Sequence, residues 1–180
     1  MSVSSVLRSG LAAPFEQLRR VAAADPRWRV ERCALGAEAG ELDLRISGES
    51  VFNSFLPVND YAAAQFGTQA RALGVERVPV RRVDAAVRTA YPDVEHRAAF
   101  LKIDTQGFDL QVFAGATALL PRVVGLLSEI SIAPLYEGMP SWLESLERYQ
   151  RAGFRLGGLF PVASDALGRP IEYDCLMVRE

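Results

Sequence analysis

The hydrophobic positions in the first half of the chain change their spacing several times. They recur every three to four residues where a helix is expected and every second residue where a strand is expected. Residues 75–84 also favour a strand, and Pro79 within them indicates an edge strand or an extended connection. The expected helices are 14–24 and 84–91, the expected strands are 28–35 and 41–47, and residues 50–75 are ambiguous between helix and loop.

The second half of the chain alternates more regularly between strand and helix patterns. Strands are expected at 98–104, 123–131, 154–160 and 171–180, and helices at 108–120 and 141–153. Strands separated by helices form parallel sheets with right-handed crossovers, whereas the last two strands lack a helix between them and should form an antiparallel hairpin. The pattern predicts an α/β fold with a mostly parallel sheet and an antiparallel C-terminal strand.

Two of these strands are near-continuous apolar runs that carry charge only at their carboxyl ends. Residues 98–104 and 123–129 are therefore predicted to be adjacent, parallel central strands covered on both faces. Lys102 and Asp104 point to the same side of the first strand, and Glu129 ends the second. Ligands of open α/β sheets bind beyond these carboxyl ends, and buried strands normally exclude charge. Lys102 and Asp104 therefore favour a functional site over a structural ion pair.

The neighbouring acidic residues are less informative. Glu129 fits a functional residue and a solvated strand end equally well. Asp109 lies in the first turn of a predicted helix, where a carboxylate complements the helix dipole, so a structural role is favoured. Gly107, between the strand and this helix, would allow a sharp turn or a close approach to a ligand.

Composition excludes several classes of function. A length of 180 residues suits a single domain over residues 1–180, and a net charge of -2 gives no basic face for nucleic acid. The apolar runs are too short to span a membrane, and the N-terminus lacks the apolar region of a secretory signal, so a cytoplasmic location is expected. With His96 as the single histidine, no histidine-based metal site is expected, and Cys33 and Cys175 are expected to be buried thiols.

The segment from Lys102 to Ala116 resembles a known family motif. Lys102-Ile103-Asp104, Gly107, Asp109 and the later Gly115-Ala116 are similar to the K-I-D-x-x-G-x-[DE] segment and following helix of the FkbM family of S-adenosylmethionine-dependent methyltransferases. Weaker similarities run along the chain from about Pro14. They include Ala34-Leu35-Gly36, Ser54 and the C-terminal segment YDCLMVR.

This resemblance implies a Rossmann-like class I methyltransferase sheet and S-adenosylmethionine as the cofactor. It implies O-methylation of a small-molecule acceptor, such as a sugar or a natural product. Asp104 would accept the hydroxyl proton and Lys102 would stabilise the alkoxide. The implied catalytic residues are Lys102, Asp104 and Glu129, and the implied cofactor-binding residues are Ala34, Leu35, Gly36, Ser54 and Asp104.

The sequence departs from the family at its N-terminal end. The family's glycine-rich D-x-G-A-N-x-G loop is missing, and no acidic residue precedes Glu16 to bind a ribose hydroxyl. The expectation is therefore an N-terminally truncated fold, with residues 1–13 as an irregular remnant of a preceding strand and with weak or absent cofactor binding.

Two other functions stay open beside methyl transfer. The chain is alternatively a non-catalytic remnant or interaction module that pairs its uncovered strand with another chain, including a second copy of itself. A weaker alternative is a binding protein for an anion held at Lys102. Nucleotide-hydrolysing, dinucleotide-binding and serine-esterase motifs are absent from the sequence.

Overall fold

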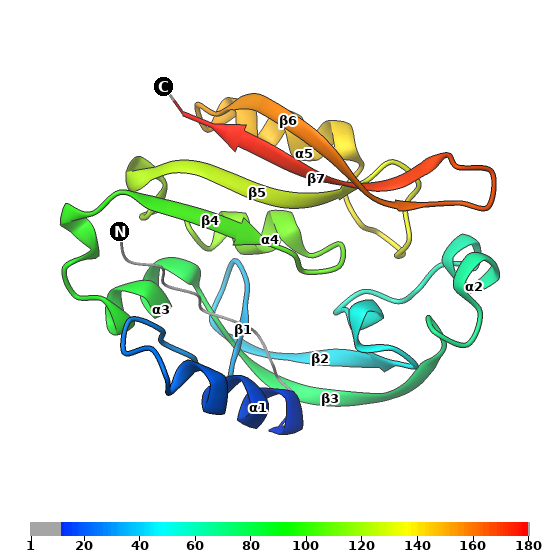
Figure 1. Cartoon of the computed structure of the whole chain (residues 1–180), viewed down its shortest axis with the longest axis horizontal. Helices are drawn as coiled ribbons and strands as arrows, with labels where there is room; N and C mark the ends of the chain where they lie inside the picture. The colour runs from blue at the N-terminus through cyan, green and yellow to red at the C-terminus, as the bar shows by residue number, and fades with distance from the viewer. Residues whose placement is uncertain (1–11, 180) are drawn as a thin grey trace.

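The computed structural model describes residues 12–179, which form two mixed β-sheets with short helices around them (Figure 1). The strand order is β1-β3-β2 in one sheet and β4-β5-β7-β6 in the other. The strands are β1 (Ala34–Leu35), β2 (Gly40–Ser47), β3 (Ala72–Arg81), β4 (Ala99–Ile103), β5 (Val123–Ser131), β6 (Arg155–Ser164) and β7 (Pro170–Val178). The α-helices are α1 (Ala12–Ala22), α2 (Asp60–Phe66), α3 (Val83–Ala90), α4 (Asp109–Ala114) and α5 (Trp142–Arg151).

The four-stranded sheet contains the predicted pairings. β4 and β5 are adjacent and parallel, with Lys102 opposite Leu127. β7 lies between β5 and β6 and runs antiparallel to both, so the predicted C-terminal hairpin is confirmed. Helix α5 begins with a capping box between Ser141 and Glu144 and ends before Gly153, whose φ of 89° suits a helix stop. Helix α4 is shorter than the predicted helix at 108–120, since its last residue is Ala114 and Gly115 is its C-cap.

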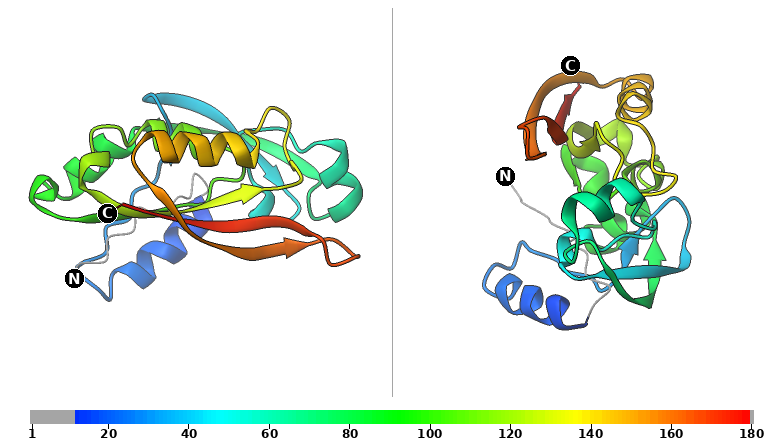
Figure 2. Two further views of the ribbon diagram at one scale, coloured as in Figure 1. Left: turned by 90° about the horizontal axis from the view of Figure 1, so that it is seen from above. Right: turned by 90° about the vertical axis from the view of Figure 1, so that its right-hand side faces the viewer.

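The expected single, mostly parallel sheet covered on both faces is not what residues 12–179 form. Each sheet mixes parallel and antiparallel pairs, and β4 lies at the edge of its sheet. Helix α5 lies along one side of this sheet (Figure 2), where side chains such as Ile103 and Leu126 are buried. The opposite face of the sheet carries Phe100 on β4 and Phe160 on β6, whose side chains are 54% and 53% exposed. The prediction that β4 and β5 are covered on both faces is therefore wrong, although both strands are apolar along most of their length.

The N-terminal elements differ from the prediction in two places. Only Ala34 and Leu35 of the expected strand at 28–35 pair with another strand. β3 is the middle strand of its sheet, although Pro79 indicated an edge or a connection. Proline is tolerated here because β1 is short and pairs with β3 only at Val80 and Arg81. Along the rest of β3, including Pro79, the side that faces β1 has no residue of β1 paired to it. Of residues 1–13, only 12 and 13 are described, and they belong to α1; residues 1–11 lie outside the described structure.

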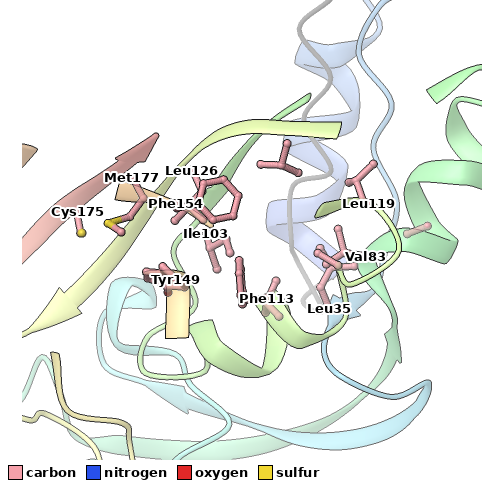
Figure 3. Packing of buried hydrophobic residues seen from close by; sticks show 14 of the residues in the cluster. Leu35, Val83, Ile103, Phe113, Leu119, Leu126, Tyr149, Phe154, Cys175 and Met177 are labelled. Atoms are coloured by element: carbon pink, nitrogen blue, oxygen red, sulfur yellow. The ribbon is translucent and has the colours of Figure 1, made fainter. Parts of the chain in front are cut away.

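One hydrophobic cluster contains residues of both sheets (Figure 3). Leu35 from β1 and Ile103 from β4 belong to it, together with Phe113 from α4 and Tyr149 from α5. The rings of Phe113 and Tyr149 meet edge to face, with centroids 4.9 Å apart. Both cysteines are free and buried, as predicted. Over residues 12–179, no helix combines the length and apolarity needed to cross a bilayer.

A close backbone contact joins the end of β1 to the end of α4. A β-carbon at position 115 would stand 2.0 Å from the carbonyl oxygen of Gly36. The Gly115 carbonyl in turn accepts a hydrogen bond of 3.1 Å from the backbone N–H of Asp84. Only glycine allows this approach, so Gly115 fixes the separation between the first sheet and α4.

We expect Gly115→Ala to destabilise the fold strongly, because the new methyl group meets backbone atoms that cannot rotate away. The expected loss is about 2 kcal/mol or more in the free energy of unfolding. Chemical denaturation of the purified variant measures it. Gly74→Ala is the matched control, since a β-carbon there has no neighbour within 4 Å. Equal denaturation midpoints for the two variants would contradict this account.

Candidate functional site

A cavity of about 590 Å³ lies at the carboxyl ends of β4 and β5, where the two sheets come together. One part of its wall is mainly apolar, with Val51, Phe52 and Phe55 from the segment 50–55 and Val162 and Ala163 from β6. The other part is polar and comes from the loop after β4 and from β5 and β7. The lining residues are Ala34, Leu44, Ser50, Val51, Phe52, Asn53, Ser54, Phe55, Phe66, Asp104, Thr105, Gln106, Glu129, Val162, Ala163 and Glu172.

Gln106 joins two carboxylates in this cavity. Its Nε2 donates to Oε2 of Glu129 at 2.7 Å and to Oδ1 of Asp104 at 3.1 Å. Its Oε1 accepts from the Tyr136 hydroxyl at 2.9 Å. Asp104 and Glu129, which are 25 positions apart in the chain, are therefore bridged by a single amide group.

The loop that carries Gln106 is held in an uncommon conformation. Gln106 has a φ of 51° and Gly107 a φ of 83°. A non-glycine residue in this left-handed region is unfavourable unless its surroundings hold it there. The Ser54 hydroxyl donates to the backbone carbonyl of Gln106 at 2.6 Å. A β-carbon at Gly107 would lie 3.2 Å from Tyr136 and Met139, so packing also restricts the loop.

Asp109, in the first turn of α4, also holds the loop that carries Gln106. Its carboxylate is buried and accepts from the backbone N–H and the hydroxyl of Thr105, at 3.3 and 2.8 Å. It also accepts a hydrogen bond of 3.2 Å from the Ser128 hydroxyl. This Ser128 hydroxyl lies 2.7 Å from the hydroxyl of Tyr149. These contacts tie β4, α4, β5 and α5 together, in agreement with the structural role predicted for Asp109.

Glu129 lies in an unfavourable environment for a negative charge. Burial raises the pKa of the Glu129 carboxyl from 4.5 to about 8, and the carboxylates of Glu172, Asp104 and Asp109 act in the same direction. The hydrogen bond from Gln106 lowers this pKa and only partly offsets the increase. Glu129 therefore exchanges a proton near neutral pH, as a general acid or base must.

Two further side chains complete the polar wall. Glu172 on β7 is buried, and its Oε1 accepts from the Ser131 hydroxyl at 2.9 Å. Burial raises the pKa of the Glu172 carboxyl, and Asp104 and Asp109 act in the same direction. Burial also raises the pKa of the Tyr136 hydroxyl, so it stays protonated and acts as a hydrogen-bond donor.

Lys102 lies beside the cavity rather than in its wall. Its ammonium is 3.6 Å from Asp104 and 3.6 Å from Asp174 on β7, and its side chain is half exposed. Asp104 and Glu129 both line the cavity. The structure thus brings together Asp104 and Glu129, and it places Lys102 in contact with the cavity through Asp104.

The predicted cofactor-binding residues are divided between the cavity and the core. Ala34 and Ser54 line the cavity, and both are buried. Leu35 belongs to the hydrophobic cluster instead. Gly36 packs against Val80 and Phe108, so neither Leu35 nor Gly36 lines the cavity.

Sequence reasoning did not identify Gln106, Tyr136 or Glu172. Gln106 occupies an unspecified position of the family segment, and Tyr136 and Glu172 come from distant parts of the chain. Two signals were available: a polar residue directly before Gly107, and a glutamate near the start of the last strand. Neither signal shows which side chains meet, because this depends on the pairing of β7 with β5.

The raised pKa of Glu129 predicts a pH-dependent stability. The folded protein keeps this proton up to about pH 8, whereas the unfolded chain releases it near 4.5. The stability contributed by the bound proton is therefore complete below pH 4.5 and is lost as the pH rises to about 8. Glu129→Gln removes the titration, so its free energy of unfolding should fall less over this range than that of the wild type.

Urea denaturation at a series of pH values measures this difference. Glu137→Gln, at an exposed residue, is the control and should follow the wild type. Glu172 is present in all three proteins, but it is coupled to Glu129 by charge repulsion, so the difference between the curves includes the effect of Glu129 on the titration of Glu172. A Glu129→Gln curve parallel to the wild-type curve would show that Glu129 has no raised pKa.

Comparison with models of protein families identifies a match over most of the chain. Residues 11–156 match the family model described as the methyltransferase FkbM domain. A search of curated proteins and a search of solved structures each found no match. The matched region includes β4, the loop with Gln106, and β5 with Glu129, and it covers most of the 180 residues. The chain therefore belongs to the FkbM methyltransferase domain family.

Proposed function

We propose that this methyltransferase-family chain uses S-adenosylmethionine to methylate a hydroxyl group of a small-molecule acceptor bound in the cavity. The observation that carries the proposal is the position of Glu129. Its carboxyl group lines the cavity, its pKa is raised to about 8, and it is bridged to Asp104 by Gln106. A site at the carboxyl ends of β4 and β5 is also where open α/β folds bind ligands.

The lining of the cavity fits part of the cofactor. The apolar wall, with Phe52, Phe55 and Val162, suits an adenine ring, and the carboxylates suit ribose hydroxyls and cationic groups. Among the described residues that line the cavity, none is lysine or arginine, so the cofactor's own carboxylate lacks a cationic partner there. This incomplete match supports weak binding by the chain as it stands.

Proton transfer is the step to which these residues contribute. When bound, S-adenosylmethionine supplies an electrophilic methyl group. With the cofactor bound, the hydroxyl proton of the acceptor would pass to Glu129 as the acceptor oxygen takes the methyl group and the thioether product is released. A carboxylate with a pKa near the working pH suits this role better than one with an ordinary pKa. Asp104 accepts a hydrogen bond from the same Gln106 amide as Glu129, and in this proposal it orients the hydroxyl group of the acceptor. Such orientation supplies much of the rate in reactions of this kind.

Lys102 has a secondary role in this proposal. Its ammonium, 3.6 Å from Asp104, reduces the negative charge of the carboxylate cluster. The ammonium is also 3.6 Å from Asp174, so direct stabilisation of the alkoxide would require it to move away from this second partner. We therefore assign Lys102 to the charge balance of the site rather than to the acceptor.

One observation favours a second candidate function. The face of the four-stranded sheet that carries Phe100 and Phe160 is exposed, and β4 pairs with β5 alone among the described strands. Exposed apolar faces and open strand edges mark interaction surfaces. A non-catalytic module, which binds another chain or a second copy through this surface, is therefore the alternative to methyl transfer.

Cofactor affinity is the first test. The described lining residues include no lysine or arginine, so the cofactor's carboxylate makes no hydrogen bonds to a cationic side chain there, each of which would contribute about 1–3 kcal/mol. We expect isothermal titration of the purified chain with S-adenosylmethionine to give a dissociation constant of about 1 mM or weaker. Titration with adenosine, which lacks the cofactor's carboxylate, is the control and should bind similarly. A micromolar constant for S-adenosylmethionine would contradict this expectation.

The second test concerns the base. We expect Glu129→Gln to reduce methyl transfer by about a hundredfold or more, because glutamine cannot accept the hydroxyl proton. The assay measures transfer of a labelled methyl group from saturating S-adenosylmethionine to simple sugars and hydroxylated aromatic compounds. Glu137→Gln is the matched control and should retain wild-type activity. Wild-type turnover that survives in Glu129→Gln would exclude Glu129 as the base, and no wild-type turnover would favour the non-catalytic alternative.

A further inference from the structure

We propose that Gln106 is the positioning residue of this site: its side-chain amide holds the carboxyl groups of Asp104 and Glu129 in a fixed relation to the cavity. This inference rests on the proposed function for its catalytic meaning. The assignment itself depends on contacts within the chain, and it extends the site beyond the residues that the family motif indicates.

The first argument is the orientation of the amide. A glutamine amide has a donor end and an acceptor end, and its orientation is decided by its partners. The Tyr136 hydroxyl donates to Oε1 at 2.9 Å, and its raised pKa keeps this proton in place. Nε2 must then face the two carboxylates, where it donates one proton to each. Tyr136 therefore determines which end of Gln106 meets Glu129.

The second argument is the conformation of the backbone at Gln106. Its φ of 51° costs free energy for a non-glycine residue, and such positions persist where the surroundings impose them. The Ser54 hydroxyl holds the Gln106 carbonyl at 2.6 Å, and the same hydroxyl oxygen accepts from the backbone N–H of Leu56 at 3.0 Å. The segment that forms the apolar wall thus fixes the backbone from which the amide extends.

The third argument is the charge around Glu129. The groups that surround it from neighbouring elements are mostly acidic, with one ammonium and one phenol: Lys102, Asp104, Asp109, Tyr136, Glu172 and Asp174. Gln106 Nε2 is the donor at hydrogen-bond distance from Glu129, and it favours the ionised carboxylate. Without this donor, the acidic neighbours would keep Glu129 protonated to still higher pH, so an even smaller fraction of it could accept a proton near neutral pH.

The experiment is a direct titration of Glu129 in the full chain without any ligand. Carbon NMR of glutamate labelled at the carboxyl carbon follows the group, and Glu129→Gln assigns its signal. We expect Gln106→Met, which keeps the side-chain length but removes the donor, to raise the titration midpoint of Glu129 by about one pH unit. Gln150→Met, at an exposed glutamine on α5, is the matched control and should leave the midpoint unchanged.

Tyr136→Phe is the second variant, and it covers the case in which Gln106→Met does not fold. It removes only the hydroxyl that orients the amide, and we expect a smaller rise in the same midpoint. A midpoint for Glu129 that is unchanged in a folded variant would overturn the proposal. A lack of wild-type methyl transfer would overturn the proposed function instead, and the NMR result would still decide the positioning role of Gln106.

Discussion

The buried carboxylate of Asp109 is the interaction on which the geometry of the site depends. It accepts hydrogen bonds from Thr105 in the loop after β4 and from Ser128 on β5, and the Ser128 hydroxyl also meets the hydroxyl of Tyr149 on α5. A buried carboxylate is costly unless such donors satisfy it, so each partner must stay in place. The turn between β4 and α4 is therefore held rigidly, and this turn carries Gln106 into the cavity.

The site combines this rigid support with unfavourable electrostatics. Glu129 and Glu172 are both removed from water and lie near other carboxylates, so the pKa of each is raised. The structure also holds Gln106 at a positive φ. Such features reduce stability, and folded proteins concentrate them at sites where they serve binding or chemistry. The packed cluster around Phe113 and Tyr149 is the part of the fold that offsets these costs.

The four-stranded sheet has two different faces, and this asymmetry links the fold to both candidate functions. One face is packed against α4 and α5 and supports the loop of the site. The other face exposes Phe100 and Phe160, with Lys102 held between Asp104 and Asp174. The ion pairs keep a lysine at the border between an apolar surface and a polar cavity. Methyl transfer would use the cavity, whereas an interaction module would use the exposed face.

The sequence by itself determined the local elements of the second half of the chain. Near-continuous apolar runs located β4 and β5, helical spacing located α5, and the missing helix before β7 indicated its antiparallel hairpin. The charges at the ends of β4 and β5 indicated that Asp104 and Glu129 lie at one edge. Spacing reports neighbours along the chain, however, and apolar runs do not show whether one face or both are covered. This is why the exposure of Phe100 was not predicted, whereas the central position of β3 was missed because Pro79 within it indicated an edge strand.

Tertiary structure alone decided which distant side chains meet at the site. Tyr136, Glu172 and Ser54 reach Gln106 and Glu129 through strand pairing and loop packing, and these depend on contacts between residues far apart in the sequence. The raised pKa of Glu129 arises from burial and from carboxylates on other elements, so no local pattern encodes it. The sequence therefore placed the carboxylates at the sheet edge, and only the folded chain, by removing water and adding their neighbours, gave them their chemical properties.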